Sequence, residues 1–180
     1  MEVTTQCDGT RGRTAGFFLP LYGTTQCIYN SRKKSHTMFE FHRNERARQL
    51  RPSLSRSWLL VRANSSEEVF EEAFESEADS IIIDLEDGCP AEEKDAAREQ
   101  VVRMLNSGVV AWVRINAITT EHWWKDVKAL KNVKGLRGVM LATAEHATDI
   151  DRTAAELPPG TPIIALIESA LGVHHSIEIA

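Results

Sequence analysis

Five short apolar runs, each followed by a longer amphipathic and charged stretch, constrain the fold of this chain more than any other feature. The runs are rich in β-branched residues and have the length of buried strands. The stretches between them are long enough for crossover helices, which parallel strands require. We therefore predict an α/β fold of parallel strands joined by right-handed helical crossovers. Strands are expected at residues 58–63, 80–86, 109–116, 136–142 and 162–168, and helices at 66–77, 91–106, 121–132, 147–157 and from about residue 170.

The first 55 residues have a different character. They show no sustained period of 2 or 3.6, and they mix Gly, Thr, Ser and Arg with isolated aromatic residues. Residues 1–56 carry ten Lys/Arg against four Asp/Glu, so that eleven (21 − 10) and twenty-two (26 − 4) remain in residues 57–180. We predict an irregular basic extension over residues 1–55 and a separate domain over residues 56–180. A nucleic-acid partner is not expected, because this domain has a net charge of 11 − 22 = −11 and would repel phosphates.

Composition also argues against several other classes of protein. No run approaches the roughly 18 apolar residues that span a bilayer, and the N-terminus lacks the apolar block of a secretory signal. The three cysteines, Cys7, Cys27 and Cys89, are scattered and form no CxxC pair. A disulfide scaffold or a zinc site is therefore not expected. We expect a cytoplasmic protein with no membrane partner.

Charged residues end three of the predicted strands, although strands buried on both faces are normally apolar. Asp84 and Glu86 share a face of the second strand, Arg114 lies on the third, and Glu168 ends the fifth. In a (β/α)8 barrel the C-terminal ends of the strands form the active site, so Glu86 or Asp87, Arg114 and Glu168 are expected to converge. Carboxylates around one arginine suit a divalent cation and an anionic substrate. The alternative is a set of ordinary ion pairs between strand ends and neighbouring helices or loops.

Five motifs occur in a fixed order along the same part of the chain. They are Arg56-Ser57-Trp58-Leu59-Leu60-Val61, Asp84-Leu85-Glu86-Asp87, Val113-Arg114-Ile115-Asn116, Gly138-Val139-Met140-Leu141 and Ile164-Ala165-Leu166-Ile167-Glu168-Ser169-Ala170. In this order and at this spacing they resemble the motifs of the citrate lyase beta-subunit-like family, within the HpcH/HpaI aldolase group. The resemblance runs from about residue 56 to residue 180. It implies a TIM-barrel, (β/α)8-type fold, of which about five β/α units are present.

The resemblance also implies an activity and roles for particular residues. The expected reaction is the Mg2+-dependent making or breaking of a carbon–carbon bond in a carboxylate-bearing acyl-CoA thioester, such as citryl-CoA or malyl-CoA, or in a 2-keto or hydroxy acid. By motif, Glu168 is the expected metal ligand, and Arg56 and Arg114 are the expected substrate-binding residues. Arg114, Glu86 and Asp87 are the expected catalytic group, in which the two carboxylates order water at the metal. Full-length members are expected to form homo-oligomers.

The chain departs from the family pattern at three places. Arg62-Ala63 stands where the family usually has Pro-Gly, and Ala142-Thr143 stands where it usually has Pro-Lys. The resemblance also places a second metal carboxylate in a Gly-x-x-Asp segment on a sixth strand, which residues 1–180 do not include. We therefore expect the isolated chain to bind Mg2+ weakly and to show little lyase activity. The competing interpretation is a non-catalytic barrel remnant or interaction module.

Overall fold

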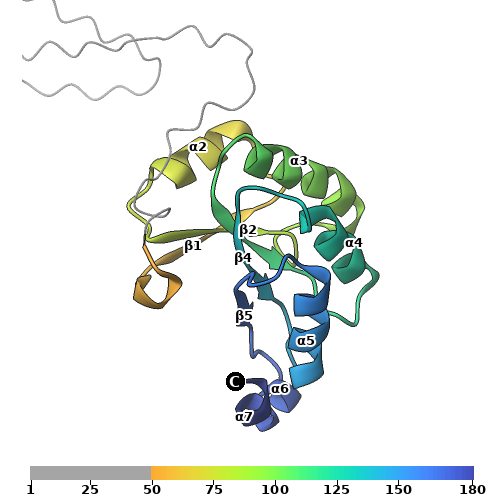
Figure 1. Ribbon diagram of the computed structural model, residues 1–180. Helices are drawn as coiled ribbons and strands as arrows, with labels where there is room; N and C mark the ends of the chain where they lie inside the picture. The colour runs from red at the N-terminus through yellow and green to blue at the C-terminus, as the bar shows by residue number, and fades with distance from the viewer. Residues whose placement is uncertain (1–49) are drawn as a thin grey trace, which may run out of the picture. The chain divides into compact units, whose positions relative to one another are not determined.

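The computed structural model describes residues 50–180, and in them five strands form one parallel sheet (Figure 1). The strands are β1 (Trp58–Arg62), β2 (Ser80–Asp84), β3 (Ala111–Ile115), β4 (Leu136–Leu141) and β5 (Ile163–Ala165). Their order in the sheet is the order in the sequence, and every neighbouring pair is parallel. The predicted parallel α/β fold is confirmed. The expectation for residues 1–49 lies outside the described residues, and the boundary at residue 55 stays a prediction.

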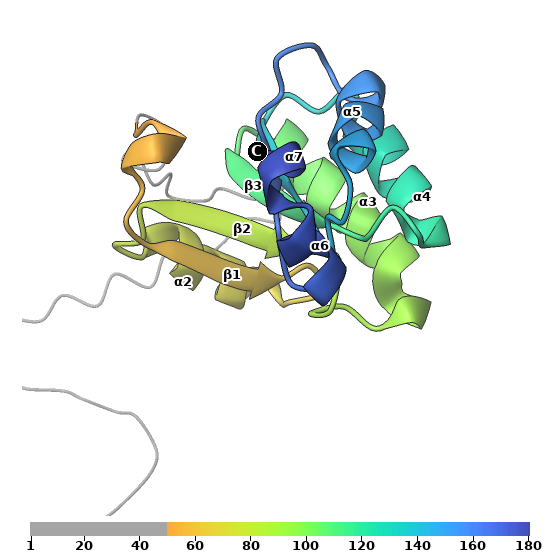
Figure 2. The same cartoon turned by 90° about the horizontal axis from the view of Figure 1, so that it is seen from below.

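Helices follow the strands in the predicted alternation. They are α2 (Glu67–Glu75), α3 (Lys94–Asn106), α4 (Glu121–Leu130), α5 (Ala147–Glu156), α6 (Ala170–His174) and α7 (Ser176–Ile179), with 3-10 turns η1 (Pro52–Leu54) and η2 (Ala91–Glu93). Helices α2 to α5 lie along one face of the sheet (Figures 1 and 2). In α2, for example, Phe70 and Phe74 are one turn apart and both are buried. No helix within residues 50–180 is long and apolar enough to cross a membrane.

The core lies between the sheet and these helices. Alternate residues of β1 to β4 point to the helix layer, as the pleat of a strand requires. They are Val61, Ile81, Ile83, Val113, Ile115, Val139 and Leu141, each no more than 6% exposed. Burying each such side chain contributes about 1.5–3 kcal/mol, so this apolar layer holds the strand ends in place.

The opposite face of the sheet has a different character and carries Trp112. This side chain is 1% exposed and packs edge-on against Trp58, with ring centroids 5.3 Å apart. Gly138, its partner on β4, leaves room for the indole, because a Cβ there would overlap the Trp112 ring and lie 2.7 Å from the carbonyl oxygen of Pro162. Leu60 on the same face is 47% exposed. The charged residues of the candidate site belong to this face.

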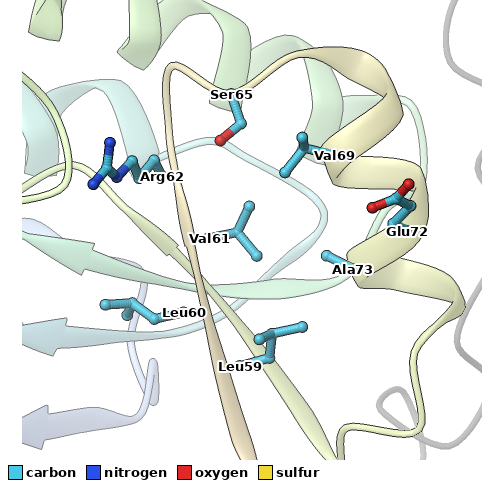
Figure 3. A pocket seen from close by; sticks show the side chains of 8 residues that line it. All are labelled: Leu59, Leu60, Val61, Arg62, Ser65, Val69, Glu72 and Ala73. Carbon is cyan, nitrogen blue, oxygen red and sulfur yellow. The ribbon is translucent and has the colours of Figure 1, made fainter.

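Strand β1 forms one edge of the sheet and has a single neighbour among the described strands. A pocket of about 380 Å³ lies beside it, between β1 and α2 (Figure 3). Its lining comes from Leu59, Leu60, Val61, Arg62, Ser65, Val69, Glu72 and Ala73. The backbone groups of an edge strand lack a ladder partner on one side, so this edge is open to a further strand.

Candidate functional site

Asp84, the last residue of β2, is the centre of a hydrogen-bonded group at the C-terminal edge of the sheet. Its carboxylate accepts bonds from Arg114 Nε (to Oδ1) and Arg114 Nη2 (to Oδ2), both 2.7 Å long. It also accepts from the backbone amides of Glu86 (2.9 Å) and Gly88 (2.8 Å). These amides curl around the carboxylate, and β2 therefore ends two residues earlier than predicted.

Gly88 is required by this turn. A Cβ at this position would overlap Asp84 Oδ2, the atom that accepts the Gly88 amide, and would lie 3.2 Å from Cγ of Arg62. A glycine lets the backbone approach the carboxylate this closely. The loop after β2 and the Asp84–Arg114 pair therefore form one compact unit.

Both members of the Asp84–Arg114 pair are shifted toward their charged forms. Burial by itself raises the pKa of Asp84, but the hydrogen bonds from Arg114, Glu86 and Gly88 and the charge of Arg114 outweigh it. The net result is a pKa below the ordinary value of 3.8. The hydrogen bonds from Arg114 to Asp84 raise the pKa of the arginine against the effect of its own burial. The pair is therefore ionised at neutral pH.

Glu86 is the second carboxylate beside Arg114, and its environment favours the ionised form less than that of Asp84 does. Its Oε2 lies 3.2 Å from Arg114 Nη1, and its side chain is only 18% exposed. Burial raises the pKa of Glu86 above its ordinary 4.5, and the adjacent Asp87 carboxylate adds to the increase. The Asp87 amide and the charge of Arg114 oppose the shift without cancelling it. Ionised Glu86 therefore costs the folded state free energy.

This shift predicts how Glu86→Gln changes stability with pH. A carboxyl whose folded pKa is raised stabilises the fold fully below its ordinary pKa of 4.5, and this contribution is lost as pH rises through the folded value. The glutamine variant cannot ionise and escapes this loss. We expect it to be more stable than wild type at pH 7, with the difference shrinking below pH 4.5, in urea unfolding followed by tryptophan fluorescence. The prediction would be contradicted if the gain in unfolding free energy of Glu86→Gln over wild type were smaller at pH 7 than at pH 4.

Glu168 follows β5 at the same edge of the sheet and is exposed. Its Oε1 accepts bonds from the backbone amide (2.8 Å) and the hydroxyl (2.9 Å) of Thr143, just after β4. Thr143 has a φ of 47°, a left-handed conformation that is unusual for a β-branched residue. Such conformations persist where surrounding contacts hold them, and here Glu168 provides two. The carboxylate of Glu168 is thus oriented by Thr143.

The structure brings only some of the predicted residues together. Glu86 and Arg114 are in contact, and Asp87 is the next residue of the same loop and is exposed. Glu168 follows β5, which lies two places from β3 in the sheet. Arg56 is not part of this group. It precedes β1, at the N-terminal end of the strand, where its backbone amide and Nε donate to Asp79 over 2.9 and 3.1 Å.

The donor set can be compared with the needs of a magnesium ion. Within residues 50–180, no three or more His, Cys, Asp or Glu side chains are grouped to hold a metal. Mg2+ usually keeps several waters and binds through one or two carboxylates together with substrate oxygens. The exposed and oriented carboxylate of Glu168 fits such a site. The described residues do not fit a site in which protein side chains supply all the ligands.

Sequence reasoning missed a buried polar network behind the site. Asn116 lies within the third strand predicted at residues 109–116, but β3 ends at Ile115, and the Asn116 side chain bonds to Lys94 of α3 and Asp126 of α4. Arg98 of α3 completes the network by donating from Nε to Asp126 Oδ1 over 2.8 Å. A signal was present in the sequence, because Lys94 and Arg98 are spaced i, i+4 on the same face of α3 as the buried Val101.

The active sites of (β/α)-barrel enzymes lie at the C-terminal ends of parallel strands, and Asp84, Glu86 and Arg114 lie at that edge of the sheet here. Comparison with known proteins agrees with this class. The model of the HpcH/HpaI aldolase/citrate lyase family matches residues 56–180. The chain belongs to this family.

Individual relatives support the assignment. The chain is 33% identical over 126 residues to a (3S)-malyl-CoA thioesterase of Cereibacter sphaeroides, a match covering 68% of this chain and 44% of the relative. It is 39% identical over 118 residues to citrate lyase subunit beta of Leuconostoc mesenteroides, covering 57% and 38%. A crystal structure of CitE from Mycobacterium tuberculosis with magnesium, acetoacetate and coenzyme A aligns with a TM-score of 0.59 and 33% identity, over 70% of this chain and 45% of that one. The chain thus spans less than half the length of these relatives.

Proposed function

We propose that this chain carries part of the active site of a Mg2+-dependent carbon–carbon lyase that acts on a carboxylate-bearing acyl-CoA thioester, such as citryl-CoA or malyl-CoA. The observation that carries the proposal is the Arg114 guanidinium, held by Asp84 beside Glu86 at the carboxyl edge of a parallel sheet. The family and the relatives named for citrate lyase and malyl-CoA chemistry support it.

Arg114 is the proposed substrate-binding residue. Its Nε and Nη2 atoms are occupied by Asp84, whereas Nη1 faces Glu86 at the edge of the group. A guanidinium fixed on one side presents its remaining donors in a set direction, which suits a substrate carboxylate. Fixed positive charge also stabilises negative charge that develops on an enolate oxygen. Because Asp84 holds the arginine in advance, little reorganisation is needed when substrate binds.

Glu168 is the proposed metal ligand, and Glu86 and Asp87 are proposed to order water nearby. When bound, Mg2+ supplies Lewis acidity toward the keto or hydroxyl oxygen of the substrate. Thr143 restrains one oxygen of Glu168 and so orients its carboxylate. Arg114 and Glu168 would then hold opposite ends of a small dicarboxylate or keto acid unit.

One observation favours the alternative, a non-catalytic remnant or interaction module. Thr143 stands where the family usually has lysine, and it donates two hydrogen bonds to the same oxygen of Glu168. A carboxylate oxygen engaged in this way is less available to a cation. Metal binding distinguishes the two interpretations.

Calorimetric titration of the 180-residue chain with Mg2+ tests the proposal. We expect weak binding that Glu168→Gln reduces at least tenfold, because Mg2+ depends on a charged carboxylate. Glu178→Gln is the matched control, since Glu178 is an exposed glutamate on α7 and is not among the residues proposed to bind metal or substrate. Equal affinities for wild type and Glu168→Gln would contradict the assignment of the metal ligand.

Cleavage of citryl-CoA and malyl-CoA, followed by chromatography of the CoA products, tests the reaction itself. We expect turnover that is slow at most, that requires Mg2+ and that disappears in Arg114→Met and Glu168→Gln. Turnover that persists in excess EDTA or in Arg114→Met would contradict the proposed mechanism. Metal binding without any cleavage, even on prolonged incubation, would favour the non-catalytic alternative.

A further inference from the structure

Lys94, the first residue of α3, is a buried lysine with an unusual set of partners. Lys94 is only 7% exposed, and its Nζ donates to the carbonyl oxygens of Leu85 and Glu86, both at 2.6 Å. A third bond of 2.8 Å goes to Oδ1 of Asn116. An ammonium group has three hydrogens, and here each has an acceptor. All three acceptors are neutral oxygens, and none is a carboxylate.

Such a group is costly to bury. An ammonium loses its hydration in the interior, and neutral carbonyl oxygens repay less of this loss than a carboxylate does. If α3 needed only an apolar side chain at this position, methionine or leucine would pack there without the desolvation of a charged group. The contribution of Lys94 must therefore lie in the atoms that it holds.

Those atoms belong to the loop that forms the candidate site. Leu85 and Glu86 directly follow Asp84, so Lys94 draws two consecutive carbonyls toward the helix layer. On the other side of the same loop, the amides of Glu86 and Gly88 bond to the Asp84 carboxylate. The loop is thus held from both sides, and the Glu86 side chain is left beside Arg114.

Asn116 ties the end of β3 into the same arrangement. Its Nδ2 donates to the carbonyl oxygen of Leu85 (3.0 Å) and to Oδ2 of Asp126 (2.6 Å), while its backbone amide donates to the same Oδ2 (3.0 Å). Asn116 is two residues beyond Arg114. One network therefore fixes both the loop that carries Glu86 and the strand that carries Arg114.

We propose that Lys94 is a positioning residue for the site: it clamps the peptide carbonyls of Leu85 and Glu86 and thereby sets the placement of Glu86 relative to Arg114. This proposal rests on the proposed function, which assigns Arg114 to the substrate and Glu86 to the water near the metal. Its test requires neither metal nor substrate. A failed Mg2+ titration and a failed test of Lys94 are therefore separate results.

Cys89 provides the reporter. It is 3% exposed, its amide donates to the carbonyl oxygen of Glu86 over 3.2 Å, and it is the only thiol left when Cys7 and Cys27 are changed to serine. If Lys94 clamps the loop, Lys94→Met removes the Lys94 bonds to the Leu85 and Glu86 carbonyls, so that the loop opens locally and exposes Cys89. We expect the rate of labelling by a thiol reagent in buffer to rise at least tenfold.

The dependence of labelling on urea separates positioning from a merely structural role. Local opening exposes little surface, so the labelling rate of Lys94→Met should depend on urea far less steeply than global unfolding does. Lys128→Met, on the exposed side of α4, is the matched control and should label at the wild-type rate. Should Lys94→Met lack a cooperative unfolding transition, Lys94→Gln, which keeps a donor, is measured in the same way.

A second readout looks at the site directly. The Nε–H resonance of Arg114 in ¹H–¹⁵N spectra reports the bond to Asp84, which is 2.7 Å long. We expect it to shift or broaden in Lys94→Met and to stay in place in Lys128→Met. Unchanged labelling of Cys89 together with an unmoved Arg114 signal would overturn the proposal. Labelling that rises only in proportion to global unfolding would overturn it equally, because Lys94 would then act through stability alone.

Discussion

Replacing Asp126 with alanine is expected to lower the free energy of unfolding by about 3–5 kcal/mol, because it breaks a buried ion pair and leaves the buried Arg98 with only the exposed Asp95 as a charged partner. Asp126 is fully buried; its Oδ1 accepts from Arg98 Nε at 2.8 Å, and its Oδ2 accepts two bonds from Asn116. Burial by itself lowers the pKa of Arg98, and the bonds to Asp126 and Asp95 outweigh it. Urea unfolding followed by tryptophan fluorescence measures the loss.

Two further variants test the reason for this loss. Asp151→Ala removes an exposed aspartate from α5 and should leave the unfolding midpoint nearly unchanged. The double variant Arg98→Met with Asp126→Leu removes both buried charges and should recover a large part of the stability. If the double variant is as unstable as Asp126→Ala, the loss comes from packing or from Asn116 and not from removing the buried partner of the Arg98 charge.

Asp84→Asn is expected to have an effect of similar size, again about 3–5 kcal/mol at pH 7, because its partner Arg114 is only 12% exposed. The introduced amide group brings two donors to a position surrounded by four donors, from Arg114 and from the amides of Glu86 and Gly88. At least one buried donor must therefore lose its acceptor. Asp87→Asn, in the same loop but exposed, is the matched control and should change stability little.

The pH dependence of this variant follows from the lowered pKa of Asp84. A carboxyl whose folded pKa is depressed stabilises the fold fully above its ordinary pKa of 3.8, and this contribution is lost as pH falls through the folded value. The difference between wild type and Asp84→Asn should therefore be constant near neutral pH and should narrow below pH 3.8. A difference that stays constant to the lowest pH at which wild type folds would show that the charge of Asp84 is not the cause.

The sequence by itself was sufficient to predict the five strands, their parallel order and the helices between them. These features depend on local properties: a β-branched run such as Ile81 to Ile83 is buried on both faces, and a helical stretch between two strands dictates a parallel crossover. The placement of Glu86, Arg114 and Glu168 at one edge of the sheet followed from the same logic, since parallel strands end on the same side, whereas contact among all three stays a prediction.

Only the tertiary structure decided which partners these residues have. Arg114 bonds to Asp84 across 30 positions in the sequence, and Lys94 bonds to Asn116 across 22. The strand periodicity could not predict that β2 ends at Asp84. The strand ends there because the amides of Glu86 and Gly88 bond to the Asp84 carboxylate, which Arg114 keeps ionised. Arg56 looked equivalent to Arg114 as a motif residue, yet it lies at the other end of its strand. Periodicity assigns a residue to a face and an edge, whereas ion pairs and hydrogen bonds depend on distances of a few ångströms between segments that only folding brings together.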